Sequence, residues 1–410
     1  MNILQITNTV CTNTNQVTGV NRIVTQLSQY WARVHQDNCF LSFFEYAYNN
    51  NIKCERGIEI ALFKATYNIK YSFTPHNFES FLLNHHIDII IFNFAANQML
   101  RFLKDICTIA RKNNIKVIYC HHFMPGSEGF SHGSLEEVLY NINSSKDIFD
   151  KSKKWLTTIT KPFSTKFIHK VIKKKYEVPY LECDKLVVFT QTYIYKYLNI
   201  VNGKNEQKFE VIPNPLSFSE FLPKDQLKNK TKEIIFVGRL VEAQKRVSAI
   251  LKIWKLVEQN PLLTDWTLKI VGEGKDETFL HWLTKRYQLK RVSFEGRQDP
   301  KPYYEKASIM VSTSAYEGWP MVLMEAMPMG CCCLAFDSYD AIHDIIEDNK
   351  NGKIIPNNNI KAYYNALSEL MLNDEKRIAM MLSAIDSSKQ FSMEVIGEKW
   401  RDLLVKMCYK

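Results

Sequence analysis

Two glutamates, Glu317 and Glu325, give the sequence its strongest chemical signal. Glu317 precedes a turn at Gly318, and Glu325 falls in a helix that Pro320 is expected to open, because proline is tolerated in the first helical turn. At about 1.5 Å of rise per helical residue, the two carboxylates lie roughly 10 Å apart. A retaining glycosidase needs a closer pair, at ~5 Å. The spacing instead suits two carboxylates that grip opposite ends of an extended ligand.

The backbone between these glutamates is predicted to bind an anion. A helix start presents free N–H groups and the positive end of the helix dipole, and this helix is expected to span Met321 to Met327. Pro328 should shorten or kink it, because proline breaks the hydrogen-bond ladder. The residues predicted to form the phosphate cradle are Gly318, Trp319, Pro320, Met321 and Val322.

A second positive element lies upstream. Gly238 and Arg239 end a predicted strand, which places the guanidinium at the carboxyl edge of a sheet, and Lys245 comes just before the next helix. A planar guanidinium and a compact ammonium can together neutralise a diphosphate leaving group as charge develops on it. An arginine and a lysine alone indicate only surface ion pairs. Together with the glutamates they favour a ligand site.

The elements that must position these residues follow an alternating pattern. Short apolar runs alternate with amphipathic helical stretches, which predicts parallel sheets with crossover helices. We expect an α/β fold of two tandem Rossmann-like, doubly wound domains that face each other across a cleft. The strands are expected at 3–6, 87–92, 116–120, 186–189 and 209–212, and then at 234–237, 268–271, 292–294, 309–311 and 332–336.

The domain boundary is predicted after Pro215, where a polar, lysine-rich stretch interrupts the alternation. This gives a first domain at 1–215, a second domain at 216–390 and a final helix at 391–410. Ser392 is the expected N-cap of that helix.

Composition limits the class of protein. The 410 residues carry 53 Lys and Arg against 43 Asp and Glu, a formal charge of +10, and 46% are hydrophobic, which argues against a disordered or fibrous chain. The ten cysteines show no CxxC spacing, which favours a reducing compartment over a disulfide framework. Neither a signal peptide nor an apolar stretch near ~18 residues is found. We therefore expect a cytoplasmic protein that is not integral to the membrane.

A basic insertion at about 146–176 stands apart from the alternating pattern. From Lys146 to Lys175 it contains ten lysines, interleaved with aromatic residues and opposed only by Asp147 and Asp150. It reads either as an amphipathic helix for an anionic membrane surface or as a solvated lysine face over ordinary core contacts. Both interpretations remain open. Scattered lysines without a reading motif do not predict nucleic-acid binding.

The order of the motifs resembles that of the retaining glycosyltransferases of family four, which have the two-domain GT-B fold. The resemblance covers about residues 233–358 and is thinner in the first half. Its motifs are Val237–Leu240 with Lys245, Ile270–Gly274, Phe294–Gly296, the Glu317 and Glu325 pair, Asn351–Gly352 and, in the first half, Thr18–Val20, His121–Pro125 and Ile212–Pro215.

The resemblance implies an acceptor-binding first domain, a nucleotide-sugar-binding second domain and a final helix that crosses back onto the first domain. It also implies roles for individual residues. Arg239 and Lys245 would hold the donor diphosphate, Glu317 would contact the sugar hydroxyls near the anomeric carbon, and Glu325 the ribose hydroxyls. Gly19 would let the first-domain loop approach the donor. His121 would reach the transferred sugar, although His122 stands where the family often has Asp, so which histidine faces the site stays open. The catalytic set is His121, Arg239, Lys245 and Glu317.

The function this implies is transfer of a sugar from a nucleoside-diphosphate sugar to a glycan or lipid-linked glycan. Surface polysaccharide or lipopolysaccharide biosynthesis at the inner face of the membrane is the expected setting. The family transfers with retention and without a bound metal, so no cofactor is expected. The alternatives are a sugar-nucleotide epimerase or phosphorylase of the same fold, or a non-catalytic basic binding module.

Overall fold

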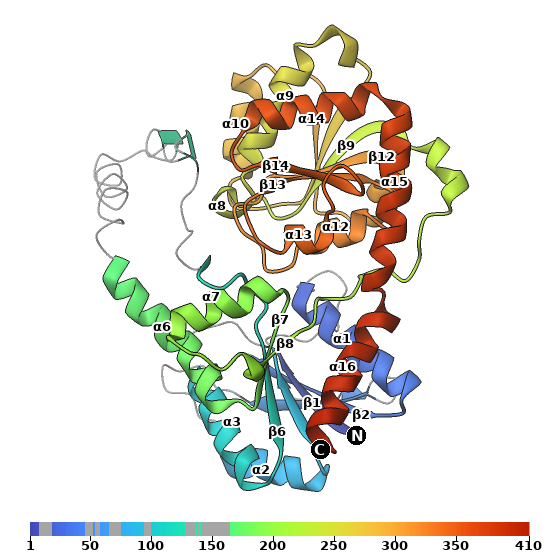
Figure 1. Ribbon diagram of the computed structural model, residues 1–410. Helices are drawn as coiled ribbons and strands as arrows, with labels where there is room; N and C mark the ends of the chain where they lie inside the picture. The colour runs from blue at the N-terminus through green and yellow to red at the C-terminus, as the bar shows by residue number, and fades with distance from the viewer. Residues whose placement is uncertain are drawn as a thin grey trace. The chain divides into compact units, whose positions relative to one another are not determined.

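The computed structural model describes residues 1–7, 19–45, 52–53, 58–64, 75–93, 100–127, 134, 136–137, 139–140 and 165–409. The chain divides into two compact units (Figure 1). The first comprises Met1–Gly126, Lys170–Ser217 and Phe391–Lys410, and the second comprises Ser127–His169 and Phe218–Gln390.

The first unit is built on a sheet whose described strands run in the order β3-β4-β2-β1-β5-β6-β7-β8. Only β3 and β4 pair antiparallel among them. The strands are β1 (Asn2–Thr7), β2 (Asn38–Glu45), β3 (Ile52–Lys53), β4 (Ile58–Lys64), β5 (Ile89–Phe92), β6 (Lys116–Cys120), β7 (Lys185–Val188) and β8 (Phe209–Val211). The flanking helices are α1 (Gly19–Val34), α2 (Pro75–Asn84), α3 (Leu100–Lys112), α6 (Thr165–Glu182), α7 (Gln191–Val201) and α16 (Met393–Cys408).

The second unit is built on a parallel sheet in the order β11-β10-β9-β12-β13-β14. The order reverses between β9 and β12, as in a doubly wound sheet. Its described strands are β9 (Thr231–Val237), β10 (Thr267–Val271), β11 (Val292–Gly296), β12 (Ala307–Ser312), β13 (Cys332–Asp337) and β14 (Gly352–Pro356). Its helices are α8 (Glu242–Lys245), α9 (Val247–Glu258), α10 (Glu277–Arg286), α11 (Lys301–Lys306), α12 (Met321–Ala326), α13 (Ile342–Ile345), α14 (Ile360–Leu372) and α15 (Asp374–Ser388).

The central strands explain why the sequence favours this fold. Every residue of β12 is buried, and β9 is buried over its last four residues. Parallel strands with helices on both faces require such continuous apolar runs. The three adjacent cysteines at 331–333 act as small hydrophobes here, because all three are fully buried. The ten predicted strands are all present, whereas β2, β3, β4 and β14 had not been predicted.

The last helix, α16, belongs to the first unit and packs on α1 (Figure 1). The rings of Trp400 and Trp31 meet edge to face at 6.2 Å between centroids, and Tyr30 Oη donates to Glu398 Oε1 at 2.6 Å. Ser392 caps the helix by accepting from Val395 N at 3.3 Å. The predicted return of the final helix to the first domain is confirmed.

The structure differs from the predicted domains in one segment. Within 134–140, which the sequence placed in the first domain, the described residues pack on the second unit. Glu136 Oε2 lies 2.9 Å from Lys252 Nζ, and the Tyr140 ring lies 5.4 Å from Phe279 and 5.2 Å from Trp282. These aromatic contacts with α10 therefore join the described residues of 134–140 to the second unit. Residues 146–164 of the basic insertion lie outside the described residues.

Among the helices that the structure describes, none has both the length and the apolar character needed to cross a membrane.

Candidate functional site

The carboxyl ends of β9 and β12 lie where the strand order of the second unit reverses. Doubly wound sheets bind ligands in the crevice at such a point. Gly238 and Arg239 follow β9, and Glu317 lies in the loop after β12. The charged residues predicted for the second domain are therefore assembled at one edge of one sheet.

Close backbone packing holds the loop after β9. Gly238 and Gly272 have φ angles of 153° and 138°, values that favour glycine. A Cβ atom on Gly272 would lie 2.0 Å from the carbonyl oxygen of Gly238, and one on Gly274 would lie 2.3 Å from that of Leu240. The glycines after β10 thus let the two loops touch, and this contact fixes the backbone on either side of Arg239, whose side chain is exposed.

Lys245 and Glu317 form a mostly buried ion pair. Lys245 Nζ lies 2.5 Å from Glu317 Oε1, and the two side chains are only 11% and 10% exposed. Gln244 links this pair to Arg239, because its Nε2 donates to Glu317 Oε2 at 3.5 Å and its Oε1 accepts from Arg239 Nη2 at 3.1 Å. Arg239, Gln244, Lys245 and Glu317 together form what we call the Lys245 cluster. Gln244 was not predicted, because an uncharged amide gives no signal in a search for phosphate-binding cations.

Two buried carboxylates hold α8, the short helix that ends at Lys245. Asp276 Oδ2 accepts from Glu242 N at 2.7 Å at the start of α8. The fully buried Glu242 carboxylate accepts from Ser248 N at 3.0 Å and from Ser248 Oγ, and so caps α9. Burial raises the pKa of the Glu242 carboxyl. Both residues were missed, and the available signal was an acidic residue at each of two helix starts.

Glu325 lies in a different environment from Glu317. It is 3% exposed and accepts from Tyr304 Oη at 3.1 Å. Its helix, α12, has Pro320 at the N-cap and Met327 at the C-cap, so it ends before Pro328, as the proline predicted. Within the predicted cradle, Trp319 and Pro320 are buried, whereas Gly318, Met321 and Val322 are partly exposed.

The paired histidines follow β6 in the first unit, and both are buried. The His121 ring packs between Tyr176 and Tyr197, at 5.1 and 5.3 Å between centroids. A ring nitrogen of His122 lies 3.0 Å from Asn93 Oδ1, just beyond β5. Burial lowers the pKa of His121 to about 3 and that of His122 to about 4. Both imidazoles are therefore neutral at pH 7.

Gly19, the remaining predicted residue, is the first residue of α1 and is exposed. The loop that precedes it, including Thr18, lies outside the described residues.

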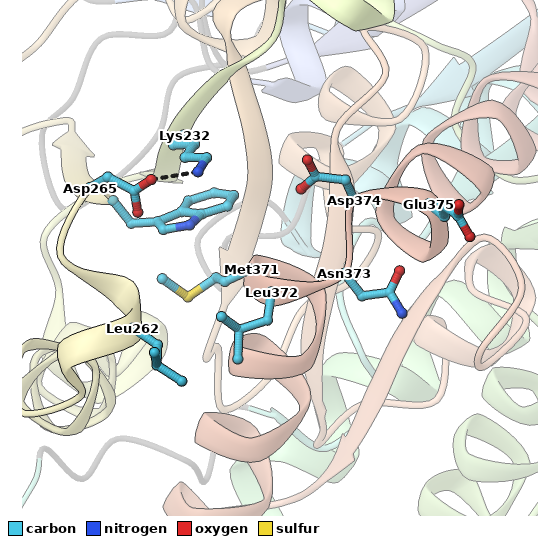
Figure 2. Close-up of a pocket in the computed structure, with 9 residues that line it drawn as sticks. Lys232, Leu262, Asp265, Met371, Leu372, Asn373, Asp374 and Glu375 are labelled. Atoms are coloured by element: carbon cyan, nitrogen blue, oxygen red, sulfur yellow. Dashed lines mark hydrogen bonds and ion pairs between the residues drawn. The ribbon is translucent and has the colours of Figure 1, made fainter.

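A separate hollow of about 420 Å³ lies at the opposite, amino-terminal edge of the second sheet (Figure 2). Three of its four charged residues form ion pairs: Lys232 pairs with Asp265, and Asp374 Oδ1 accepts from the neighbouring Arg377 Nη2 at 2.6 Å. Asn373 caps α15 by accepting from Lys376 N at 2.9 Å. Its polar side chains therefore serve the fold, and we do not assign this hollow as the functional site.

In the described part of the chain, no group of three His, Cys, Asp or Glu side chains is arranged to hold a metal ion.

Part of this chain is similar to known proteins. Residues 218–385 match the model of the glycosyl transferases group 1. An uncharacterized glycosyltransferase of Haemophilus influenzae is 32% identical over 231 residues, which are 54% of this chain and 61% of the relative. A GalNAc-α-(1→4)-GalNAc-α-(1→3)-diNAcBac-PP-undecaprenol α-1,4-N-acetyl-D-galactosaminyltransferase of Campylobacter jejuni is 29% identical over 232 residues, 56% of this chain and 62% of the relative. The chain thus spans less than two thirds of the length of these relatives.

Solved structures match over nearly the whole chain. Anabaena Alr3699/HepE in complex with UDP gives a TM-score of 0.70 at 13% identity, covering 99% of this chain and 100% of that one. Staphylococcus aureus TarM gives 0.67 at 16% identity, covering 98% and 100%. The predicted α/β architecture of two GT-B-type domains and the predicted resemblance to glycosyltransferases are both confirmed.

Proposed function

We propose, for a chain whose residues 218–385 match the model of the glycosyl transferases group 1, that the protein transfers a sugar from a nucleoside-diphosphate sugar to a glycan or lipid-linked glycan acceptor. The observation that carries the proposal is the Lys245 cluster at the reversal point between β9 and β12. It joins two cations to a carboxylate within one hydrogen-bonded network.

The chemistry follows from charge. When the bond between the anomeric carbon and the diphosphate breaks, negative charge develops on the diphosphate. Arg239 and Lys245 neutralise it, and the backbone N–H groups of Gly318, Trp319, Met321 and Val322 assist. An ammonium has three N–H donors, and Glu317 accepts one of them. Because Lys245 is mostly buried, its interaction with a phosphate is stronger than in water.

The remaining residues hold the donor and acceptor. Glu317 binds the sugar hydroxyls near the anomeric carbon, Glu325 binds the ribose hydroxyls, and Gly19 allows close approach of its loop. His121 reaches the transferred sugar as a neutral hydrogen-bonding group, since its pKa lies far below 7. Transfer without a bound metal is part of the proposal, because two side-chain cations balance the charge of the leaving group. Retention is proposed from the resemblance to the family.

Relatives indicate the setting. Among the proteins that match are an amylovoran biosynthesis glycosyltransferase of Erwinia amylovora and a lipopolysaccharide 1,6-galactosyltransferase of Escherichia coli. By analogy we assign this protein to the biosynthesis of a surface polysaccharide or lipopolysaccharide, on the cytoplasmic side of the membrane.

Replacement of the cluster residues tests the assignment. Lys245→Ala and Glu317→Ala should each lower kcat by about 10²–10³-fold, the usual cost of removing a group that stabilises developing charge. Transfer is measured by product formation from UDP-, GDP- and ADP-sugars. The matched control is Lys353→Ala, because Lys353 has the same 9% exposure as Lys245 and also pairs with a glutamate. Wild-type turnover in either cluster variant would refute the site.

The anomeric configuration of the product tests retention, and loss of activity in a chelator would contradict metal independence.

The basic helix extends the proposal to membranes. Lys173, Lys174 and Lys175 lie on α6, and Lys173 pairs with Glu177 at 3.5 Å. We assign α6 to an anionic lipid surface near the acceptor. Changing all three lysines to Gln should weaken sedimentation with phosphatidylglycerol vesicles but not change that with phosphatidylcholine. The same change at the exposed Lys104, Lys112 and Lys204 controls for net charge. Equal loss in both triple variants would favour the solvated-face interpretation.

A further inference from the structure

Arg246, the residue after Lys245, has a backbone conformation that is costly for arginine. Its φ and ψ angles are 48° and 46°, in the left-handed region, and it is both the C-cap of α8 and the N-cap of α9. Glycine adopts this conformation without penalty, whereas a side chain crowds the backbone. The chain therefore keeps an arginine at a junction where glycine would relieve strain, and the contacts of the side chain must offset that cost.

Those contacts join the carboxyl ends of three strands. Arg246 Nε donates to Thr313 O at 2.8 Å, and Nη2 donates to Ser314 O at 2.7 Å, both just after β12. Its Nη1 donates to the side chains of Asn358 at 2.5 Å and Asn357 at 3.0 Å, beyond β14. The guanidinium also lies 5.5 Å from the centre of the Phe336 ring in β13.

The loop after β12 also forms hydrogen bonds to the backbone carbonyl groups at and beside Lys245. Thr313 Oγ1 donates to Lys245 O at 2.9 Å and to Arg246 O at 3.0 Å, and Ala315 N donates to Gln244 O at 2.7 Å. Residues 244–246 are thus bonded to 313–315, two positions before Glu317. The two halves of the Lys245–Glu317 pair stand on segments that Arg246 ties together.

We propose that Arg246 is a positioning residue that sets Lys245 against Glu317 by tethering the end of α8 to the loop after β12. Its guanidinium acts through Lys245 and does not itself bind the donor. The role of this tether in donor binding rests on the proposed function, but the tether itself does not. Burial lowers the pKa of Arg246 to about 10, so the guanidinium remains charged at neutral pH.

Two substitutions separate the tether from the backbone strain. Arg246→Gly removes the side chain and suits the left-handed backbone, whereas Arg246→Ala removes the tether and keeps the strain. The matched control is Arg291→Ala. Arg291 donates from Nη1 to two carbonyl oxygens, Leu263 O at 2.5 Å and Trp266 O at 2.7 Å. Its guanidinium also lies 5.4 Å from the centre of the Trp254 ring. Arg291 precedes the amino end of β11, whereas Lys245 follows the carboxyl end of β9.

The first measurement is acetylation of lysines in the folded protein, followed by mass spectrometry. In the wild type, Lys245 and Lys353 should react slowly, because each is 9% exposed. Lys245 should react several-fold faster in both Arg246 variants, with Lys353 unchanged, and at the wild-type rate in Arg291→Ala. A Lys245 rate unchanged in Arg246→Gly would overturn the proposal. If neither variant folds, Asn357→Ala with Asn358→Gly, both at exposed positions, removes the Nη1 partners. Glycine suits the φ angle of 62° at position 358. This double variant should give a smaller change of the same sign, whereas no change would count against the tether.

The second measurement is donor turnover in the Arg246→Gly variant. A displaced Lys245 should lower kcat by up to about 100-fold, the scale of a 1 Å misplacement, while thermal stability stays near that of the wild type. If Lys245 becomes reactive but the wild type itself transfers no sugar, the tether stands and the proposed function fails. Wild-type kcat in a variant whose Lys245 is reactive would separate the tether from catalysis.

Discussion

The Lys245 cluster contains two opposite charges, on Lys245 and Glu317, that are largely shielded from water. Lys245 and Glu317 are about nine-tenths buried and lie 2.5 Å apart. Such a pair adds little to stability relative to apolar residues, because desolvation offsets the attraction, yet loss of one partner leaves a charge without compensation. The pair therefore adds little to the stability of the fold, which agrees with the ligand-binding role proposed for Lys245.

This reasoning predicts how single and double substitutions differ in the free energy of unfolding. Glu317→Gln should cost about 1–3 kcal/mol, because it leaves a buried ammonium facing a neutral amide. Lys245→Met alone should also destabilise, whereas the double variant should cost less than the sum of the two, with a coupling of about 0.5–3 kcal/mol. Urea unfolding of the four proteins measures this cycle. Additive values would mean that the two side chains do not interact in solution.

At the scale of helices and strands, the sequence predicted the charged residues at strand and helix ends better than the residues that hold them in place through hydrogen bonds. Arg239, Lys245 and Glu317 are charged residues at predicted strand and helix ends, so the pattern revealed them. Gln244 and Arg246 were not predicted, because their roles depend on hydrogen bonds to a loop about 70 residues away. No local pattern encodes such contacts.

The same limit explains the strands. The continuous apolar runs of β5, β9 and β12 predicted buried parallel strands, and their central positions follow from burial on both faces. In contrast, β2 (Asn38–Glu45) and β14 (Gly352–Pro356) carry polar or glycine residues near their ends. These segments are strands because they pair with β1 and β13, respectively. Pairing between segments that are distant in the chain cannot be predicted from a short stretch of sequence.

The segment that carries Glu137 predicts a pH effect at the same scale. Burial and the nearby Asp276 carboxylate raise the pKa of Glu137 to about 7, with a smaller effect of Glu242 in the same direction, while Lys275 opposes it. Protonated Glu137 binds Asp276 through a side-chain hydrogen bond. Because the folded-state pKa lies above the ordinary glutamate value of 4.5, this contribution to stability is complete below pH 4.5 and is lost as the pH rises through 7.

The test is the melting temperature between pH 4.5 and 8. The wild type should lose stability across this range by more than Glu137→Gln, whose amide stays neutral and can still donate to Asp276. The variant should be the more stable protein at pH 8. Glu136→Gln serves as the control, because Glu136 lies next to Glu137 on the same segment but forms an ion pair with Lys252 of α9. Parallel curves for the wild type and Glu137→Gln would show that Glu137 ionises normally.

At the scale of the whole molecule, the first unit contains residues from both ends of the given sequence. Residues 391–410 belong to the first unit, although 218–390 belong to the second. Trp400 of α16 packs on Trp31 of α1, and Leu404 of the same helix is buried. The first unit therefore reaches its full apolar core only after the second unit has been synthesised.

Gly397 is where this return is most sensitive to substitution. A Cβ atom there would lie 2.5 Å from Cε1 of Tyr30, and Tyr30 cannot move freely because its hydroxyl donates to Glu398. Gly397→Ala should therefore lower the free energy of unfolding by about 1–3 kcal/mol, as overpacking does, despite the better helix propensity of alanine. Val395→Ala, at a 41% exposed position of the same helix, should change it by less than about 0.5 kcal/mol. Guanidinium unfolding measures both, and a Gly397→Ala variant as stable as the wild type would mean that α16 packs less closely on α1 in solution. Since the change lies far along the chain from Lys245, a loss of stability without loss of kcat is expected.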